Sequence, residues 1–229
     1  MQIALIDSGI GGLTLLKRFI NECPSNDYVY FADTYAHPYG RERAFPLKMR
    51  LLSISELLYE KGAKMIIFAC NTASTVALSY VSDKLPVPII GVRPLCERAN
   101  NTLIMCTPLT AESALIKGYE SAGARVYANG CLASLIEQNC HNLTALEQYL
   151  TKELNGFKNL DSVILGCTHY VFIKEQVRRI TSAKVYDGYD PIIKEVESLY
   201  TQEGEGSIHY VFTGPRKESE YAKILAKIE

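Results

Sequence analysis

Two stretches of the sequence match each other: Ile66-Ile67-Phe68-Ala69-Cys70-Asn71-Thr72 and, 97 positions later (70 against 167), Val163-Ile164-Leu165-Gly166-Cys167-Thr168-His169. Each is an apolar strand that ends in a cysteine followed by two polar residues. Upstream, Leu5-Ile6-Asp7-Ser8 and Met105-Cys106-Thr107-Pro108 also end strands, and Asp7 and Cys106 precede the two cysteines by 63 and 61 positions. The matched spacing indicates two similar halves, each with a cysteine at the carboxyl end of a parallel strand, where such sheets bind ligands.

The rest of the chain alternates short apolar runs with helical periodicity, which predicts crossover connections and mainly parallel sheets. We expect strands at 3–6, 28–32, 64–69, 88–92, 102–106, 125–128, 162–165, 184–187 and 208–212. We expect helices from 13 to Pro24, from about 47 to Gly62, at 74–84, 111–122, 132–140, 144–154, 171–180 and 190–201, and at the C-terminus. The predicted fold is α/β, with two similar lobes related by a pseudo-two-fold axis. Each lobe is a mainly parallel sheet flanked by helices, and the active site lies between them.

Composition excludes several classes of protein. Of 229 residues, 24 are Lys or Arg and 25 are Asp or Glu, so the net charge of −1 argues against a nucleic-acid partner, which requires clustered positive charge. The apolar runs reach about six residues, well short of the ~20 that cross a bilayer. The N-terminus lacks the basic region of a signal peptide. We therefore expect no membrane association and a cytoplasmic location.

Seven cysteines, an odd number with wide gaps, argue against a disulfide framework and against Cys-x-x-Cys zinc sites. Most should be buried. The four histidines add no ligand cluster, so no metal is expected, and His37, His141 and His209 are expected at the surface or in loops. Cys70 and Cys167 differ from the other cysteines because polar residues that open a helix follow them. The positive pole of that helix should lower the pKa of each thiol and favour the thiolate.

Other polar residues stand at predicted strand ends and loops. The run Asp7–Gly12 can expose backbone N–H groups to an anion, but Thr14 stands where a dinucleotide fingerprint needs glycine, so a small carboxylate fits as well as a nucleotide. Thr107 and Thr110 could hold a carboxylate or cap a helix that starts near Ala111. Pro38-Tyr39-Gly40 lies in the polar connection 33–43, and Glu137 interrupts an apolar helix, where a solvated charge is the ordinary interpretation.

Together these residues resemble the glutamate racemase family. The matching motifs are Asp7-Ser8-Gly9-Ile10-Gly11-Gly12-Leu13-Thr14, Pro38-Tyr39-Gly40, Cys70-Asn71-Thr72-Ala73-Ser74 and Gly166-Cys167-Thr168-His169-Tyr170, which span most of the chain. The resemblance implies that the protein interconverts L- and D-glutamate without a cofactor and supplies D-glutamate for bacterial peptidoglycan. It also implies that residues 1–92 and about 188–229 form the first lobe and 93–187 the second, and it allows a homodimer.

Inverting an α-carbon requires a base on one face and an acid on the other, and thiols can populate both forms near neutral pH. By resemblance, Cys70 and Cys167 are these two groups, and Asp7 and His169 assist them. The implied substrate site is lined by Asp7, Ser8, Pro38, Tyr39, Gly40, Asn71, Thr72, Thr110, Glu137, Thr168 and His169.

Three positions depart from the family pattern. Val171 replaces a proline after the second cysteine motif, Gly188 replaces a serine after Asp187, and Arg93 stands where a glutamate precedes Pro94. These changes bear on affinity, rate and regulation rather than on reaction type. The chain also begins almost at the first motif, so we expect no N-terminal regulatory extension.

Three other functions stay open from the sequence. The first is a racemase or isomerase of the same superfamily that acts on aspartate or another small carboxylate. The second is a weakly active homologue that binds an amino acid. The third is a Cys–His hydrolase that uses Cys167 and His169 and leaves Cys70 unexplained.

Overall fold

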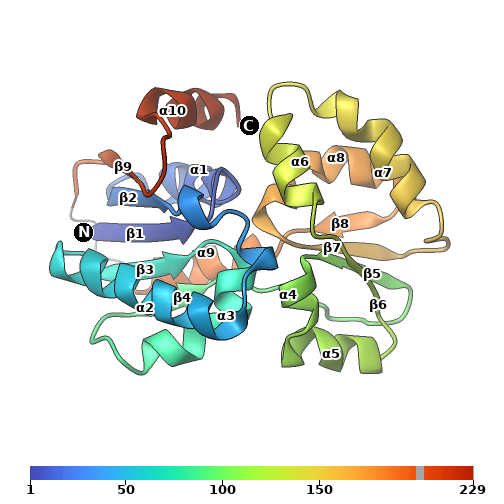
Figure 1. The fold of residues 1–229 in the computed structure, drawn as a ribbon, viewed down its shortest axis with the longest axis horizontal. Coiled ribbons are helices and arrows are strands. Elements are labelled where there is room, and N and C mark those ends of the chain that lie inside the picture. Colours follow the sequence, from blue (N-terminus) through green and yellow to red (C-terminus); the bar gives the residue numbers. More distant parts are fainter. Residues whose placement is uncertain (200–203, 229) are drawn as a thin grey trace.

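The fold is built on two β-sheets, and every hydrogen-bonded pair of strands in them is parallel. The computed structural model describes residues 1–199 and 204–228. The first sheet has the strand order β4-β3-β1-β2-β9 and the second β6-β5-β7-β8. Their strands are β1 (Gln2–Asp7), β2 (Asp27–Ala32), β3 (Met65–Phe68), β4 (Ile89–Gly91), β5 (Thr102–Cys106), β6 (Arg125–Ala128), β7 (Ser162–Gly166), β8 (Lys184–Tyr186) and β9 (Ile208–Phe212). Figure 1 shows the two sheets side by side, each between layers of helices.

The two sheets repeat one strand order. Reading the second as β8-β7-β5-β6 matches it strand for strand to β4-β3-β1-β2, so that β5 corresponds to β1 and β7 to β3. These are the pairs that the sequence matched, which confirms the predicted two-lobed α/β fold. Strand β9 pairs in parallel with β2 and extends the first sheet alone.

Helices cover both faces of each sheet (Figure 1). They are α1 (Leu13–Glu22), α2 (Ala44–Glu60), α3 (Asn71–Ser82), α4 (Pro108–Ala111), α5 (Ala114–Ser121), α6 (Leu132–Gln138), α7 (Glu147–Leu154), α8 (Lys174–Thr181), α9 (Tyr189–Ser198) and α10 (Glu218–Lys227). Short 3-10 helices are η1 (Thr34–Ala36), η2 (Tyr39–Arg41), η3 (Leu143–Leu146) and η4 (Thr168–Ile173).

Side-chain alternation along the strands builds two apolar layers in each lobe. In β1, Ile3 and Leu5 pack toward α1, α9 and α10, whereas Ala4 and Ile6 pack toward α2 and α3. The second sheet buries one face against α6, α7 and α8 and the other mainly against α5. A strand covered on both faces needs apolar residues at every position, which is why the runs in β1, β3 and β7 are continuous.

Several predicted helices have different ends. The predicted helix 74–84 begins at Asn71, with Cys70 as its N-cap residue, because the chain turns directly from strand to helix. The predicted helix 111–122 is two helices, α4 and α5, since the hydroxyls of Thr107 and Ser113 each cap a separate one.

Two more predicted helices were also displaced. The helix expected at 171–180 opens as η4 and becomes α-helical only at Lys174. The helix expected at 190–201 is α9, which begins at Tyr189 and ends at Ser198; the predicted positions 200 and 201 lie outside the described residues. Helix α1 ends before Pro24, as predicted.

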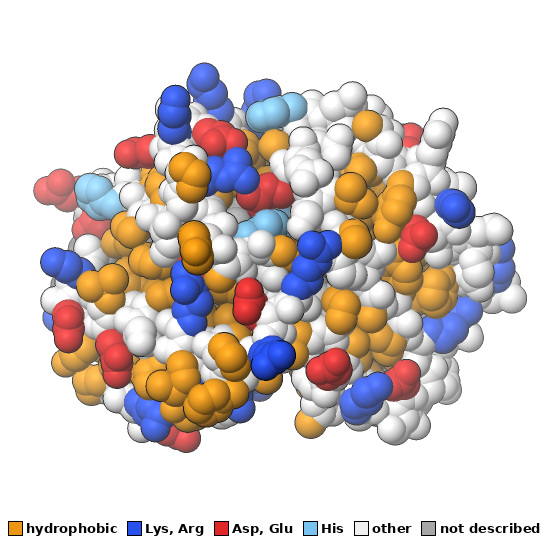
Figure 2. All heavy atoms as spheres, viewed as in Figure 1, with side chains coloured by type: hydrophobic (Ala, Val, Ile, Leu, Met, Phe, Trp, Pro, Cys, Tyr) orange, Lys and Arg blue, Asp and Glu red, His pale blue; other side chains and the backbone are white. Residues whose placement is uncertain are grey.

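The described part of the chain contains no helix that is both long enough and apolar enough to cross a bilayer. Apolar side chains do reach the surface, notably on the outer side of α2, where Phe45 and Met49 are exposed. Figure 2 shows orange side chains spread over the α2 and α3 region, while histidine, acidic and basic side chains meet along the seam between the lobes.

Candidate active site

Cys70 and Cys167 follow corresponding strands, β3 and β7, and both are buried, with 6% and 5% of their surface exposed. Each stands at the N-terminus of the next helix, α3 or η4. Burial raises the pKa of Cys70, and electrostatic interactions with Asp7 and Cys167 add to this shift, so the two thiols belong to one electrostatic environment. The fold thus brings a cysteine from each lobe to the seam between the two sheets.

Asp7 joins the two lobes at this seam. Its Oδ1 accepts a hydrogen bond from the backbone N–H of Gly9 at 2.9 Å, and its Oδ2 accepts one from the Thr168 hydroxyl at 3.0 Å. Burial raises the pKa of Asp7, although the nearby His169 and these two donors act in the opposite direction. Asp7 in turn raises the pKa of Cys70, so the carboxyl and the first thiol are electrostatically coupled.

Three buried threonine hydroxyls form a second contact between the lobes. Thr72 Oγ1 lies 3.0 Å from Thr107 Oγ1 and 2.9 Å from Thr110 Oγ1. Thr107 also caps α4, as one of the two predicted roles required, although the helix starts at Pro108 rather than near Ala111. Beside Thr72, the amide of Asn71 is buried, and within the described chain neither its oxygen nor its nitrogen has a hydrogen-bond partner. A buried amide without partners is costly, and a polar ligand in the site would satisfy it.

The third contact centres on Glu137, which is buried, so the solvated-charge interpretation was wrong. Its Oε2 lies 2.9 Å from His169 Nε2 and accepts the backbone N–H of Ile10 at 3.2 Å. Its Oε1 faces the guanidinium of Arg216 at 3.1 Å. Burial would raise the pKa of Glu137, but the hydrogen bond and charge of His169 prevail and lower it to about 2.

The charges around the second thiol differ from those around the first. Burial alone would lower the pKa of His169, but hydrogen bonds to Cys167 and Glu137 raise it well above 6.5, so the ring is an imidazolium at neutral pH. Burial raises the pKa of the Cys70 thiol well above 9, with Asp7 and Cys167 adding to the effect. The backbone N–H groups of Thr72 and Ala73 oppose this shift. The predicted lowering at Cys70 was therefore wrong in direction, because burial outweighs the helix pole.

His37 is a residue whose contacts with the site the sequence analysis missed. It was expected at the surface or in a loop, and it does lie in the loop between η1 and η2. It is partly buried there, with its Nδ1 3.4 Å from Ser8 Oγ and its Nε2 3.7 Å from Glu137 Oε2. The expectation that the histidines add no ligand cluster was also wrong, since one ligand atom from each of His37, Glu137 and His169 lies within 4.8 Å of the others. The position of His37 directly before Pro38-Tyr39-Gly40 was the available signal. No pattern pointed to Arg216.

These three residues could hold a metal ion only at a cost. The raised pKa of His169 means that a proton already lies between its ring and Glu137, and an ion would have to displace that proton. Arg216 already pairs with the other oxygen of Glu137. The group is better described as a hydrogen-bonded cluster than as a metal centre.

The loop carrying Pro38, Tyr39 and Gly40 closes over the seam. The Tyr39 hydroxyl donates to Asp33 Oδ2 at 2.7 Å, and Asp33 is also paired with Arg50 and accepts from Thr213. The Tyr39 hydroxyl is therefore occupied by Asp33, so only the backbone of Tyr39 is available to bind a ligand. A Cβ at Gly40 would stand 2.3 Å from Thr107 Cβ, so this loop touches the second lobe directly.

Changing Gly40 to alanine is expected to obstruct closure of the lobes and lower kcat/KM by about 100-fold, since a displacement near 1 Å at a reacting centre costs about that much. Steady-state kinetics of the variant and the parent protein measure the effect. Gly118→Ala is the matched control: its Cβ would meet no atom within 4 Å, and alanine within α5 should add about 0.5–1 kcal/mol of stability. Equal kinetics in the two variants would show that the contact with Thr107 does not matter.

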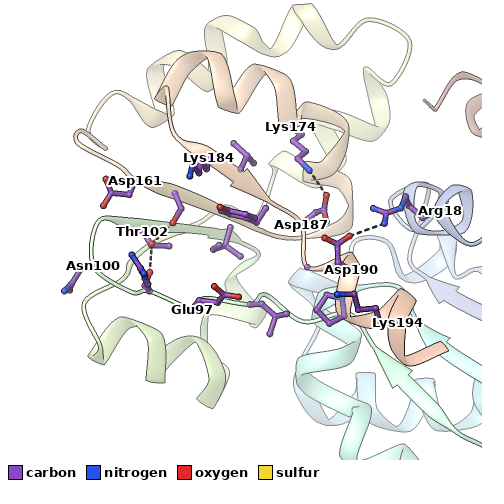
Figure 3. Close-up of a pocket in the computed structure, with 18 residues that line it drawn as sticks. Arg18, Glu97, Asn100, Thr102, Asp161, Lys174, Lys184, Asp187, Asp190 and Lys194 are labelled. Carbon is purple, nitrogen blue, oxygen red and sulfur yellow. Dashed lines mark hydrogen bonds and ion pairs between the residues drawn. The ribbon is translucent and has the colours of Figure 1, made fainter. Parts of the chain in front are cut away.

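A cavity of about 1050 Å³ lies away from these residues. It is lined by five residues between Leu95 and Thr102, by residues at the start of β7, by β8 and the two residues after it, and by the start of α9. Figure 3 shows the ion pairs Lys174–Asp187 and Arg18–Asp190 at its wall. None of the candidate site residues lines it. Cys70 and Cys167, by contrast, are buried at the seam.

Comparison with known proteins gives a consistent family. No family model matches the chain. A glutamate racemase of Clostridium botulinum (strain Alaska E43 / Type E3) is 34% identical, with 97% of this chain and 96% of the relative covered. That of Aquifex pyrophilus is 31% identical, with 93% and 89% covered. The structure of a Francisella tularensis glutamate racemase in complex with D-glutamate superposes with a TM-score of 0.81 at 28% identity, covering 99% of this chain and 94% of that one. Because the 34% identity extends over nearly the full length of both chains and the fold is shared, this chain belongs to the glutamate racemase family.

Proposed function

We propose that this protein interconverts L- and D-glutamate without a cofactor, using Cys70 and Cys167 as the two proton-transfer groups. The observation that carries the proposal is the placement of these two buried thiols at corresponding strand ends, β3 and β7, on either side of one seam. The similarity to glutamate racemases, one of them in complex with D-glutamate, supports the choice of substrate.

The proton balance is simple. One sulfur, as thiolate, takes the α-proton from Cα, and the electron pair of the C–H bond stays on the substrate as a carbanion spread over its carboxylate. The other sulfur, as thiol, gives its proton to the opposite face of the same carbon. The product has the inverted configuration, and the two sulfurs have exchanged protonation states. Nothing is oxidised or reduced.

The two sulfurs differ in their surroundings. Because the pKa of Cys70 is raised, Cys70 is the thiol and the acid. His169 is hydrogen-bonded to Cys167 and is the group placed to exchange a proton with that sulfur or to balance charge on it. Electrostatic stabilisation of this kind is strongest where water is excluded, as it is in this seam.

Polar groups on both lobes would hold the substrate. Asn71 offers two amide atoms without partners. The backbone of Tyr39 and Gly40 and the hydroxyls of Thr72 and Thr110 offer donors to the two carboxylates, and Asp7 and Ser8 offer acceptors to the ammonium group. The Thr168 hydroxyl holds the Asp7 carboxylate in place. Pro38 shapes the loop beside them, and Glu137 holds His169 in place.

The test is incubation with L-glutamate in deuterated water. The two-base mechanism predicts that, at early times, deuterium enters Cα of the D-glutamate formed and not the recovered L-glutamate, because the exchanged thiol delivers its deuteron from the opposite face. Mass spectrometry of the separated enantiomers measures this. Label in recovered L-glutamate without inversion would indicate a single base. No label would indicate a binding protein or another substrate, which parallel incubations with aspartate would identify.

We further propose that the D-glutamate enters peptidoglycan synthesis in the cytoplasm. For the moving units, we propose residues 1–92 with 188–229 against 93–187; the pairing of β9 with β2 and the packing of α9 and α10 on the first sheet support this division. A homodimer is the assembly that the family resemblance allows, and sedimentation velocity would decide it.

A further inference from the structure

His37 brings an imidazole from the first lobe between Ser8 and the Glu137–His169 pair. Its Nδ1 faces Ser8 Oγ at 3.4 Å, and its Nε2 faces Glu137 Oε2 at 3.7 Å. The rings of His37 and His169 are 5.1 Å apart, centre to centre. The two-base mechanism makes no use of this residue, although three candidate site residues surround it.

The surroundings of His37 fix its charge. Burial and the positive charges of His169 and Arg216, against the opposing effect of Glu137, together lower its pKa to about 4. The ring is therefore neutral at physiological pH, with one nitrogen carrying a proton and the other a lone pair.

The same surroundings select which nitrogen carries the proton. Nε2 is buried, and no hydrogen-bond partner for it exists among the described residues; the Glu137 carboxylate lies 3.7 Å from it. A proton on Nε2 points toward that negative charge, whereas a lone pair there would be repelled by it. The lone pair is then on Nδ1, and the Ser8 hydroxyl must donate its hydrogen to it.

A Ser8 hydroxyl that donates to His37 presents only oxygen lone pairs to the substrate. An α-ammonium group has N–H donors and no acceptor, so the side chains that bind it must accept. Both carboxylate oxygens of the neighbouring Asp7 already accept from Gly9 and Thr168, which increases the importance of Ser8 as an acceptor.

We propose that His37 is a positioning residue that holds the Ser8 hydroxyl as an acceptor for the substrate's α-ammonium group. This inference rests on the proposed function. It concerns substrate binding rather than proton transfer, so its signature is a change in KM with little change in kcat.

Three substitutions at His37 separate its two nitrogens. Asparagine can place an amide oxygen near the position of Nδ1 and keep the acceptor for Ser8. Glutamine can place its amide near Nε2 and keep only the contact with Glu137. Phenylalanine keeps the ring and removes both. We expect His37→Phe and His37→Gln to raise KM for both enantiomers about tenfold, the scale of one lost hydrogen bond, with kcat changed less than about threefold. His37→Asn should stay within about threefold of the parent KM.

A double-mutant cycle that combines His37→Phe with Ser8→Ala is the second test. If His37 acts through Ser8, adding His37→Phe to Ser8→Ala should raise KM no further. The proposal is overturned if the two effects multiply, if His37→Asn is as impaired as His37→Phe, or if His37→Gln keeps the parent KM. Far-UV circular dichroism checks that each variant is folded. If His37→Phe does not fold, the KM of His37→Asn is compared with that of His37→Gln, and this comparison alone tests the proposal. Failure of the proposed function would appear separately, as absence of racemisation in the parent protein.

Discussion

Replacing Cys167 with serine is expected to lower kcat for racemisation by about 10²–10⁴-fold in both directions, the usual contribution of one acid–base group. Each turnover needs a base on one face of Cα and an acid on the other, so loss of either stops inversion. A serine hydroxyl holds its proton far more tightly than a thiol, and the imidazolium of His169 cannot compensate for that difference. Cys70→Ser should lose as much, because the same two groups serve both directions with their roles exchanged. Circular dichroism of L- and D-glutamate measures the rates.

Cys96→Ser is the matched control for these variants. Its sulfur donates to the carbonyl oxygen of Arg98, a bond that a serine hydroxyl can also make, and it takes no part in the seam. We expect parent activity from this variant. Retention of full turnover by either Cys70→Ser or Cys167→Ser would refute the two-base assignment.

The sequence was sufficient to predict the two lobes because their strands are covered on both faces. Continuous apolar runs such as 64–69 mark such strands, and the matched cysteines identify β3 with β7. Since the carboxyl ends of parallel strands share one edge of a sheet, residues directly after strands could be placed at the seam, as Asp7, Cys70 and Cys167 were. Helix ends were less predictable, because a hydroxyl such as that of Ser113 can either cap a new helix or lie within a continuous one.

Contacts between the lobes were beyond a reading of the sequence. Glu137 and Arg216 meet across 79 positions, and Ile10 donates to Glu137 across 127. No local pattern encodes such pairs, since they depend on how two separately folded sheets are placed. Burial was equally hidden: the helix pole after Cys70 is visible in the sequence, but the desolvation that raises the pKa of its thiol is not.

The Glu137–His169 pair should control both stability and pH dependence, and Glu137→Gln tests it. Glutamine keeps a hydrogen-bonding group but removes the negative charge, so the pKa of His169 should fall toward 6.5 and less positive charge would face Cys167 at neutral pH. We expect kcat/KM to fall about 10–100-fold. We also expect the alkaline limb of the pH profile of kcat/KM to move to lower pH by at least about one unit, because the lost charged hydrogen bond is worth about 1.5–3 kcal/mol.

The stability of this variant follows from the signs of the two shifts. The raised pKa of His169 stabilises the fold fully below pH 6.5, and this contribution is lost as pH rises through the folded-state value. The lowered pKa of Glu137 contributes above pH 4.5 and is lost as pH falls toward about 2. Thermal unfolding should therefore show the largest deficit of Glu137→Gln between about pH 4.5 and 6.5, narrowing at both extremes. Glu120→Gln, which removes an exposed pair with Lys117, should change stability by less than about 1 kcal/mol and leave the pH profile in place. If Glu137→Gln lowers activity equally at all pH values, Glu137 is only a structural residue and does not set the charge of His169.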